Sequence, residues 1–151
     1  MYQRILLAVD GSRASELALR QAAIIAHATG SEVEALFVAD NSDVFFGLSF
    51  YNPAKVMEGV LSFGREALAG AAACLESAGI KNTTVLLERP LAPGKISATL
   101  VAEADAWNAD LIVMGTHGRR GVGRLVMGSV AEGVVRKTNK PVLLIRSESE
   151  D

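Results

Sequence analysis

Several kinds of residue are scarce in this chain of 151 residues, and each shortage excludes a class of protein. The single cysteine, Cys74, excludes an internal disulfide framework, and with only two histidines besides it the chain lacks the usual ligands of a zinc site. The longest aliphatic runs, at 111–114 and 142–145, are far shorter than the ~20 residues that cross a bilayer, so we expect no membrane insertion. Aromatic residues make up 5% of the chain and the net charge is −2, which argues against a nucleic-acid groove.

The composition that remains is that of one compact domain, because 50% of the residues are hydrophobic and 21% are charged. A folded chain of this length buries roughly 68–70% of the surface that its unfolded form exposes, so it needs no disulfide or metal. We expect one domain over residues 1–147, followed by a short acidic tail over 148–151. Asp10 interrupts the first apolar segment where a secretory signal would continue, so we expect a cytoplasmic protein.

Basic residues are concentrated toward the C-terminal end. Between residues 117 and 146 the only acid is Glu132, whereas seven of the fifteen basic residues lie there: Arg119, Arg120, Arg124, Arg136, Lys137, Lys140 and Arg146. Since aromatic residues and an overall basic excess are both lacking, a small anion is the expected partner of this segment.

Short apolar runs alternate with helical patterns along the whole chain. Runs at 5–9, 33–39, 83–87, 111–114 and 142–145 predict five strands. Apolar residues at helical spacing predict helices between Ser12 and Gly30, from Pro53 to Gly79, from Pro93 to about Trp107, and over 130–137. Strands that are apolar on both faces and joined by helices predict an α/β fold with a parallel sheet covered on both sides.

The loop after the fourth predicted strand, 115–129, has the composition of a phosphate cradle. It contains five glycines and three arginines, and a Gly-Ser step directly precedes the last predicted helix. Glycines leave backbone N–H groups accessible, and a helix begins with partial positive charge. In an open parallel sheet, ligands bind beyond the carboxyl ends of the strands, where this loop is expected to lie.

The spacing of this loop resembles the nucleotide motif of the ATP-binding branch of the universal stress protein family. Gly115 is followed after two residues by Gly118, and after nine more by Gly128 and Ser129. Residues 5–12 resemble that family's first strand and turn, and residues 109–115, 128–132 and 140–146 agree as well, so the likeness spans the chain. The segment 88–90, Glu-Arg-Pro, departs from it, because many members have a glycine near that proline.

The resemblance implies a doubly wound, Rossmann-like domain similar to the adenine nucleotide alpha hydrolases, with strand order 3-2-1-4-5. It also implies that ATP binds with its adenine over the ends of the first two strands, with Asp10 near the ribose or base, and with Mg²⁺ held mainly by phosphate oxygens and water. The nucleotide-binding residues expected from it are Asp10, Val38, Ala39, Gly115, Gly118, Arg119, Gly128, Ser129 and Val130.

Each of these residues also has a purely structural explanation. The glycines could serve only to allow positive φ in a tight loop. Ser129 could be a helix N-cap, and Asp10 could merely cap its own turn or the following helix. The arginines of the loop could form a solvated basic face.

Other phosphate and hydrolase motifs are missing from the sequence. The Gly94-Lys95 step continues with Ile96 rather than Ser or Thr, so it is no P-loop, and no Gly-x-Ser-x-Gly elbow occurs. No general base for phosphoryl transfer and no metal or catalytic residue can be named. The favoured function is a nucleotide-gated signalling or stress-response module. A slow ATPase or nucleotide-transfer enzyme and a nucleotide-free dimeric interaction module remain as alternatives.

Two further expectations concern protein contacts. The fifth strand, 142–145, closes one side of the sheet with few charges, so we expect a homodimer edge there, antiparallel about a twofold axis as the resemblance implies. A protein partner of unknown identity would read the nucleotide state. Four aromatic residues gather within the stretch from Val44 to Tyr51, which predicts either a mobile flap or contact loop or a small core under the second helix.

Overall fold

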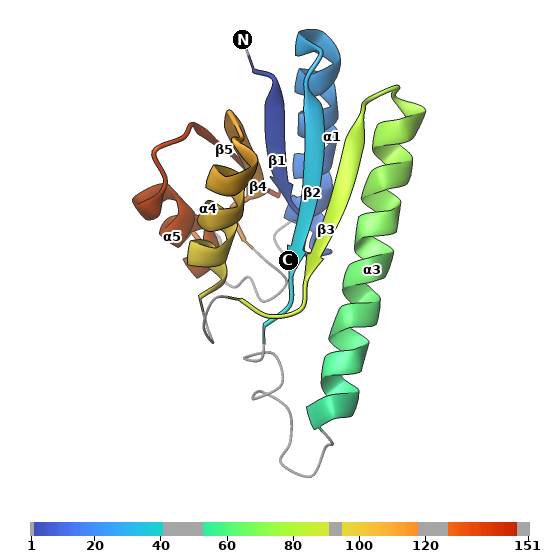
Figure 1. The fold of residues 1–151 in the computed structure, drawn as a ribbon, viewed down its shortest axis with the longest axis vertical. Coiled ribbons are helices and arrows are strands. Elements are labelled where there is room, and N and C mark those ends of the chain that lie inside the picture. Colours follow the sequence, from blue (N-terminus) through green and yellow to red (C-terminus); the bar gives the residue numbers. More distant parts are fainter. Residues whose placement is uncertain (1, 41–52, 91–94, 118–126, 148–151) are drawn as a thin grey trace.

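The computed structural model describes residues 2–40, 53–90, 95–117 and 127–147, and it contains one sheet of five parallel strands in the order β3-β2-β1-β4-β5 (Figure 1). The strands are β1 (Arg4–Ala8), β2 (Glu32–Val38), β3 (Asn82–Leu87), β4 (Leu111–Gly115) and β5 (Val142–Ile145). The predicted fold class and strand order are confirmed, and each strand agrees with its predicted range to within one residue at either end. The aromatic segment 45–51 lies outside the described residues.

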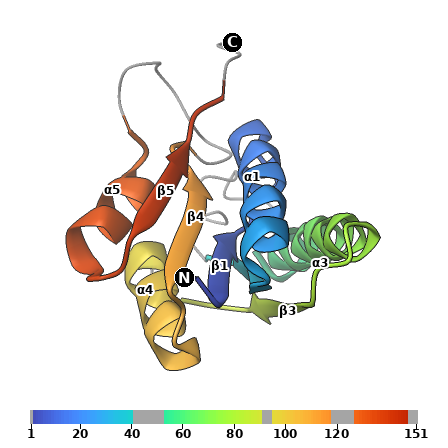
Figure 2. The ribbon, with the colours of Figure 1, turned by 90° about the horizontal axis from the view of Figure 1, so that it is seen from above.

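Helices cover both faces of the sheet, as Figure 2 shows. One face carries α1 (Arg13–Thr29) and α3 (Pro53–Ser77), and the other carries α4 (Ile96–Trp107) and α5 (Ser129–Lys137). The predicted start of the third helix at Pro93 is wrong, because Lys95 is the N-cap of α4 and its backbone is not helical, with φ −109° and ψ 48°.

The core is divided by the sheet into two layers, because successive side chains of a strand point to opposite faces. Ile5 and Leu7 of β1 pack with α1 and α3, whereas Leu6 packs with α4 and α5. Four alanines of α1 are buried, at positions 14, 18, 22 and 26, which lets this helix lie close to the sheet. In the part of the chain that the structure describes, no helix combines the length and apolar character needed to cross a membrane.

The turn before β4 is tied to the start of β1 by Asp110. Its carboxylate accepts from the backbone N–H of Gln3 at 2.8 Å and from that of Arg4 at 2.9 Å, and its own N–H donates to the Arg4 carbonyl at 2.7 Å. The hydrogen bonds from Gln3 and Arg4 favour the charged carboxylate and lower the pKa of Asp110. This residue therefore fixes where β1 and β4 begin to pair.

A second carboxyl, that of Glu34, is buried and has fewer hydrogen bonds than that of Asp110. Glu34 lies within β2 at 5% exposure, and its Oε1 atom has no hydrogen-bond partner among the described residues. Burial, a hydrogen bond to the Glu103 carboxyl of α4, and the negative charges of Glu103 and Glu32 raise the pKa of Glu34 from 4.5 to about 7. The sequence interpretation of 33–39 as a plain apolar strand missed this carboxyl.

We expect Asp110→Ala to lower the free energy of unfolding at pH 7 by about 1 kcal/mol, since water can replace part of the lost hydrogen bonding at this exposed site. Because the folded state lowers the pKa of Asp110, its stabilisation is present above the unfolded pKa and is lost as pH falls. Urea unfolding at pH 7 and pH 3 should show the difference between variant and wild type shrinking in acid. Asp105→Ala, which removes only an exposed ion pair with Lys140 at 3.8 Å, is the matched control and should have a smaller effect.

We expect Glu34→Gln to stabilise the protein at pH 8 by about 1–3 kcal/mol, because it removes the penalty of a buried charge. The folded pKa of Glu34 is raised, so the wild type loses stability as pH rises from 4.5 to about 7, and the variant should lose none over that window. Urea unfolding from pH 4 to pH 8 measures this, with the exposed Glu66→Gln as control. Parallel stability curves for wild type and Glu34→Gln would contradict it.

Candidate functional site

The candidate site lies at the carboxyl ends of β1 and β4, where the strand order reverses. From β1 the chain proceeds through α1 to β2 on one side, and from β4 it proceeds through α5 to β5 on the other (Figure 1). Loops that leave two adjacent parallel strands in opposite directions open a space between them. The segments that surround this space are 10–12, 38–40, 115–117 and 127–130.

The turn after β1 is organised by hydrogen bonds between its own residues. Asp10 Oδ1 accepts from the Ser12 N–H at 2.9 Å, and the Asp10 N–H donates to Ser15 Oγ at 3.1 Å. Ser12 Oγ accepts from the Ser15 N–H at 3.1 Å and is the N-cap of α1. One oxygen of Asp10 is therefore engaged in shaping the turn.

Gly11 sits at the top of this turn in a conformation that favours glycine, with φ +80°. A Cβ at this position would collide with the ring of Phe63 from α3, which is 38% exposed. Phe63 in turn packs edge-on against Phe37 of β2, with the ring centroids 6.4 Å apart. The sequence analysis did not identify Phe63 as part of this wall, because its distance from Gly11 in sequence hides the contact.

Gly115 ends β4 where α1 begins. A Cβ at Gly115 would lie 2.6 Å from Ala14 Cβ and 3.0 Å from the Ala14 carbonyl carbon, so the glycine is needed for close packing. Its φ is not positive, which corrects the structural alternative that explained this glycine by backbone conformation. The role of Gly115 is thus explained by packing.

Thr116 connects the end of β4 to the start of α5. This buried residue donates its N–H to the Ile145 carbonyl at 3.0 Å, and its own carbonyl accepts from the Gly128 N–H at 2.7 Å. Its hydroxyl is within 3.1 Å of His117 Nδ1, and Ser12 Oγ donates to the His117 carbonyl at 3.4 Å. The turn after β1, the end of β4 and the start of α5 are therefore joined in one network.

The first residues of α5 differ from the sequence interpretation. Gly128 is the N-cap, with φ −65° and ψ 158° and no side-chain cap, so Ser129 is the first helical residue and not the cap. The backbone of Gly128 is one that any residue adopts, so positive φ does not explain this glycine either. By helix geometry the N–H groups of Ser129 and Val130 have no acceptor within the helix and lie at its positive end.

The remaining predicted residues lie at the end of β2 or outside the described residues. Val38 is the last residue of β2 and is half-buried. The Ala39 N–H donates a hydrogen bond to the Leu87 carbonyl of β3 at 2.9 Å. Asp40, which the sequence analysis did not select, follows at 2% exposure. Gly118 and Arg119 lie outside the described residues. Within the described ranges, no three His, Cys, Asp or Glu side chains gather as a metal site.

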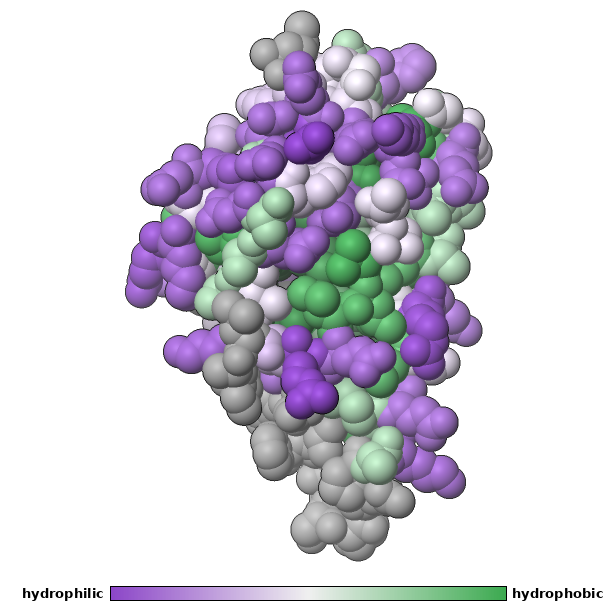
Figure 3. Space-filling view, viewed as in Figure 1, coloured by the Kyte–Doolittle hydropathy of each residue, from purple (hydrophilic) through white to green (hydrophobic). Residues whose placement is uncertain are grey.

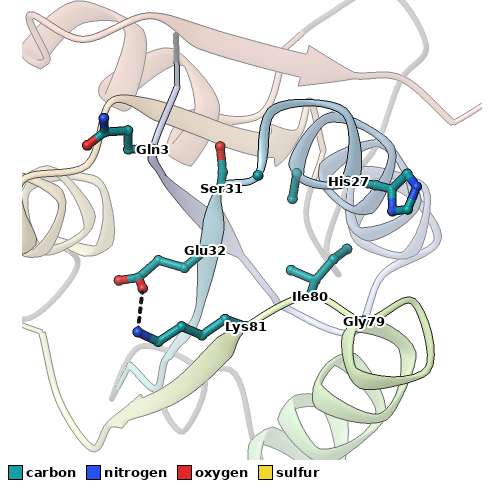
Figure 4. A pocket seen from close by; sticks show the side chains of 9 residues that line it. Gln3, His27, Ser31, Glu32, Gly79, Ile80 and Lys81 are labelled. Carbon is teal, nitrogen blue, oxygen red and sulfur yellow. Dashed lines mark ion pairs between the residues drawn. The ribbon is translucent and has the colours of Figure 1, made fainter.

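A shallow cavity of about 300 Å³ lies at the opposite end of the sheet, near the amino ends of β2 and β3 (Figure 4). Glu32 and Lys81 form an ion pair across it at 3.2 Å, and the last turn of α1 contributes His27. This cavity shares none of the predicted nucleotide-binding residues.

The universal stress protein family model matches residues 1–146. A universal stress protein of Methanocaldococcus jannaschii is 35% identical over 152 residues, which cover 100% of this chain and 86% of that protein. The crystal structure of a universal stress protein from Burkholderia pseudomallei has a TM-score of 0.78 at 29% identity and covers 97% of both chains. The structure of an Archaeoglobus fulgidus universal stress protein in complex with dAMP has a TM-score of 0.65 at 29% identity, covering 95% of this chain and 98% of that one.

Proposed function

Because this chain belongs to the universal stress protein family, we propose that it binds an adenine nucleotide, with ATP as the expected ligand, at the carboxyl ends of β1 and β4. It acts as a nucleotide-gated signalling or stress-response module of the cytoplasm. The relative from Archaeoglobus fulgidus whose structure holds dAMP supports an adenine nucleotide as the ligand class.

The start of α5 is the observation that carries this proposal. The hydrogen bond from the Gly128 N–H to the Thr116 carbonyl, at 2.7 Å, holds this helix end at the mouth of the site. Gly128 has an ordinary φ and caps the helix without a side chain, so its missing Cβ leaves room for a phosphate at the N–H groups of Ser129 and Val130. Gly118 and Arg119 would complete the phosphate contacts.

The base and ribose would lie toward β2. Asp10 Oδ1 accepts from the Ser12 N–H, so Oδ2 is the oxygen that a ribose hydroxyl would reach. The Ala39 N–H already donates to the Leu87 carbonyl of β3, so the adenine would contact the Ala39 carbonyl or the Val38 side chain instead. Mg²⁺ would be held mainly by phosphate oxygens and water, as suits an ion that dehydrates reluctantly.

We expect Gly128→Val to reduce ATP affinity at least a hundredfold while the fold persists, because its side chain would occupy the space at the first N–H groups of α5. Ser129→Ala should do less, about a ten- to hundredfold loss, since one hydrogen bond to a charged group is lost. Gly70→Val is the matched control, because no atom lies within 4 Å of a Cβ at that position on α3. Calorimetric titration with ATP and Mg²⁺ measures the affinities, and circular dichroism checks the fold.

Wild-type affinity in a folded Gly128→Val variant would contradict the phosphate role of this helix start. The absence of nucleotide from freshly purified, denatured protein, together with no binding by calorimetry, would leave the dimeric interaction module as the function. Phosphate release from bound ATP would identify slow turnover, for which the described residues offer no evident general base.

We propose that a homodimer forms through β5. This strand lies at the edge of the sheet, and all four of its residues remain half-buried in the single chain. Its unpaired backbone groups can bond to a second copy across a twofold axis.

Leu144→Lys should therefore give a monomer in sedimentation at micromolar concentration, because a charge at the edge opposes pairing. Val135→Lys, at an apolar position of α5 that is 45% exposed, should leave the oligomer intact. A monomeric wild type, or an unchanged Leu144→Lys oligomer, would overturn the dimer proposal.

A further inference from the structure

Among the described residues, no helix covers the β3 edge of the sheet face that carries α4 and α5. α4 packs on α5 and on β2, whereas the helix that packs on β3 is α3, from the other face. In the register of β2 and β3, Leu36 lies opposite Val85 and Val38 lies opposite Leu87. Val38, Val85 and Leu87 are only partly buried against the core of this face. Figure 3 shows an apolar surface at this place, between α4 and α3.

We call the partly buried Val38, Val85 and Leu87, together with the buried Leu36 that separates Val38 from Glu34 along β2, the open strip. The next row of the register, toward the amino ends of β2 and β3, pairs Glu34 with Thr83. Glu34 projects from the same face as Leu36, because both are even-numbered residues of one strand. The strip therefore ends on a carboxyl that is 95% buried, since its exposure is 5%.

Among the described residues, the charged groups that act on Glu34 are both acidic, Glu103 and Glu32. Glu103 of α4 lies against it, β1 contributes Leu6 opposite, and β3 contributes Thr83. The nearby Glu32 is engaged by Lys81 at 3.2 Å and by Arg4 at 3.7 Å. Among the described residues, Glu34 Oε1 is the one buried side-chain polar atom with no hydrogen-bond partner.

We propose that the open strip is a docking surface for an amphipathic helix of a partner protein, and that Glu34 and Glu103 together bind an arginine of that helix. The proposal does not rest on nucleotide binding, because the strip lies on the face of the sheet. It shares Val38 with the proposed adenine site at the strand ends, so the tests below use protein without nucleotide.

The spacing of the strip suits a helix. Rows of side chains on one face of a strand recur every two residues, about 6.6 Å apart. Residues i and i+4 of an α-helix rise about 6 Å along its axis, so two apolar residues and an arginine on successive turns match the three rows. A helix on this face is also the layer that an α/β sheet normally carries, and the described part of the chain places none over β3.

The chemistry of the carboxyl pair selects arginine. A guanidinium offers several N–H donors in a rigid plane and can bond two carboxylates at once, whereas an ammonium is more strongly hydrated and therefore harder to bury. Burial and the neighbouring Glu103 raise the pKa of Glu34 to about 7, so the free pair holds a proton about half of the time at neutral pH. Because the guanidinium takes the place of that proton, its affinity for the carboxyl pair should increase as pH rises.

The first probe is hexylguanidinium, which combines an apolar chain with the guanidinium, and hexylurea is its neutral isostere. We expect hexylguanidinium to shift the methyl resonances of Val38, Val85 and Leu87 saturably in the full chain without nucleotide. Its apparent affinity should rise about tenfold from pH 6 to pH 8, because the deprotonated fraction of a group with a pKa of about 7 rises by that factor. Hexylurea should bind more weakly and without pH dependence.

Variants distinguish the contribution of the carboxyl pair to probe binding from that of the apolar surface. Glu34→Gln should abolish both the pH dependence and the preference for the guanidinium, whereas Glu66→Gln, an exposed change on α3, should alter neither. Leu87→Ser should weaken both probes. A helical peptide with leucines at i and i+4 and arginine at i+8 should bind about tenfold more tightly than the same peptide with glutamine at i+8.

Three results would overturn the proposal. Equal binding of hexylguanidinium and hexylurea at every pH would show that the carboxyl pair takes no part. An absence of methyl shifts at the strip would show that the surface binds neither probe. Methyl shifts that depend on protein concentration alone would identify a second copy of this chain as the occupant, in place of a partner helix.

Discussion

All five strands run parallel, and this constraint gathers the candidate chemistry at one edge of the sheet. Parallel strands share one carboxyl edge, and the reversal of strand order between β1 and β4 separates the two loops that leave there. Asp10 and Gly128 are far apart in sequence, yet both border the resulting space. The hydrogen bond between Thr116 and Gly128 then holds the start of α5 at this edge, so that the positive end of a helix faces a space that the sheet itself creates.

The same edge depends on close packing by small residues. The buried alanines of α1 bring that helix near the sheet, and Gly115 lacks a side chain where Ala14 lies. Glycines of one loop can therefore be required for different physical reasons. Gly115 is explained by packing, and the ordinary φ of Gly128 leaves the approach of a ligand as the reason that we propose for it. A motif of spaced glycines does not distinguish these reasons, because each removes the same side chain.

The two faces of the sheet are covered unequally, which gives the protein a second distinctive surface. Among the described residues, two helices on each side of five strands leave part of β3 without a covering helix on the α4 face, and apolar side chains there are only partly buried. The carboxyl of Glu34 borders this surface inside the fold, where a charge is expensive. The buried carboxyl next to a partly exposed apolar strip is the basis of the docking surface that we propose.

The sequence by itself determined the elements, their order and the parallel sheet, because hydrophobic periodicity and helix capping are local properties that the chain carries in its own pattern. It also predicted an anion site in the loop after β4, and this stays a prediction. The tertiary structure decided what no local pattern contains: that Gly115 meets Ala14, that Phe63 lies over Gly11, and that Glu103 of α4 reaches Glu34 of β2. These contacts join residues from different elements, and their chemistry exists only once the sheet and its helices have brought those residues within a few ångströms of one another.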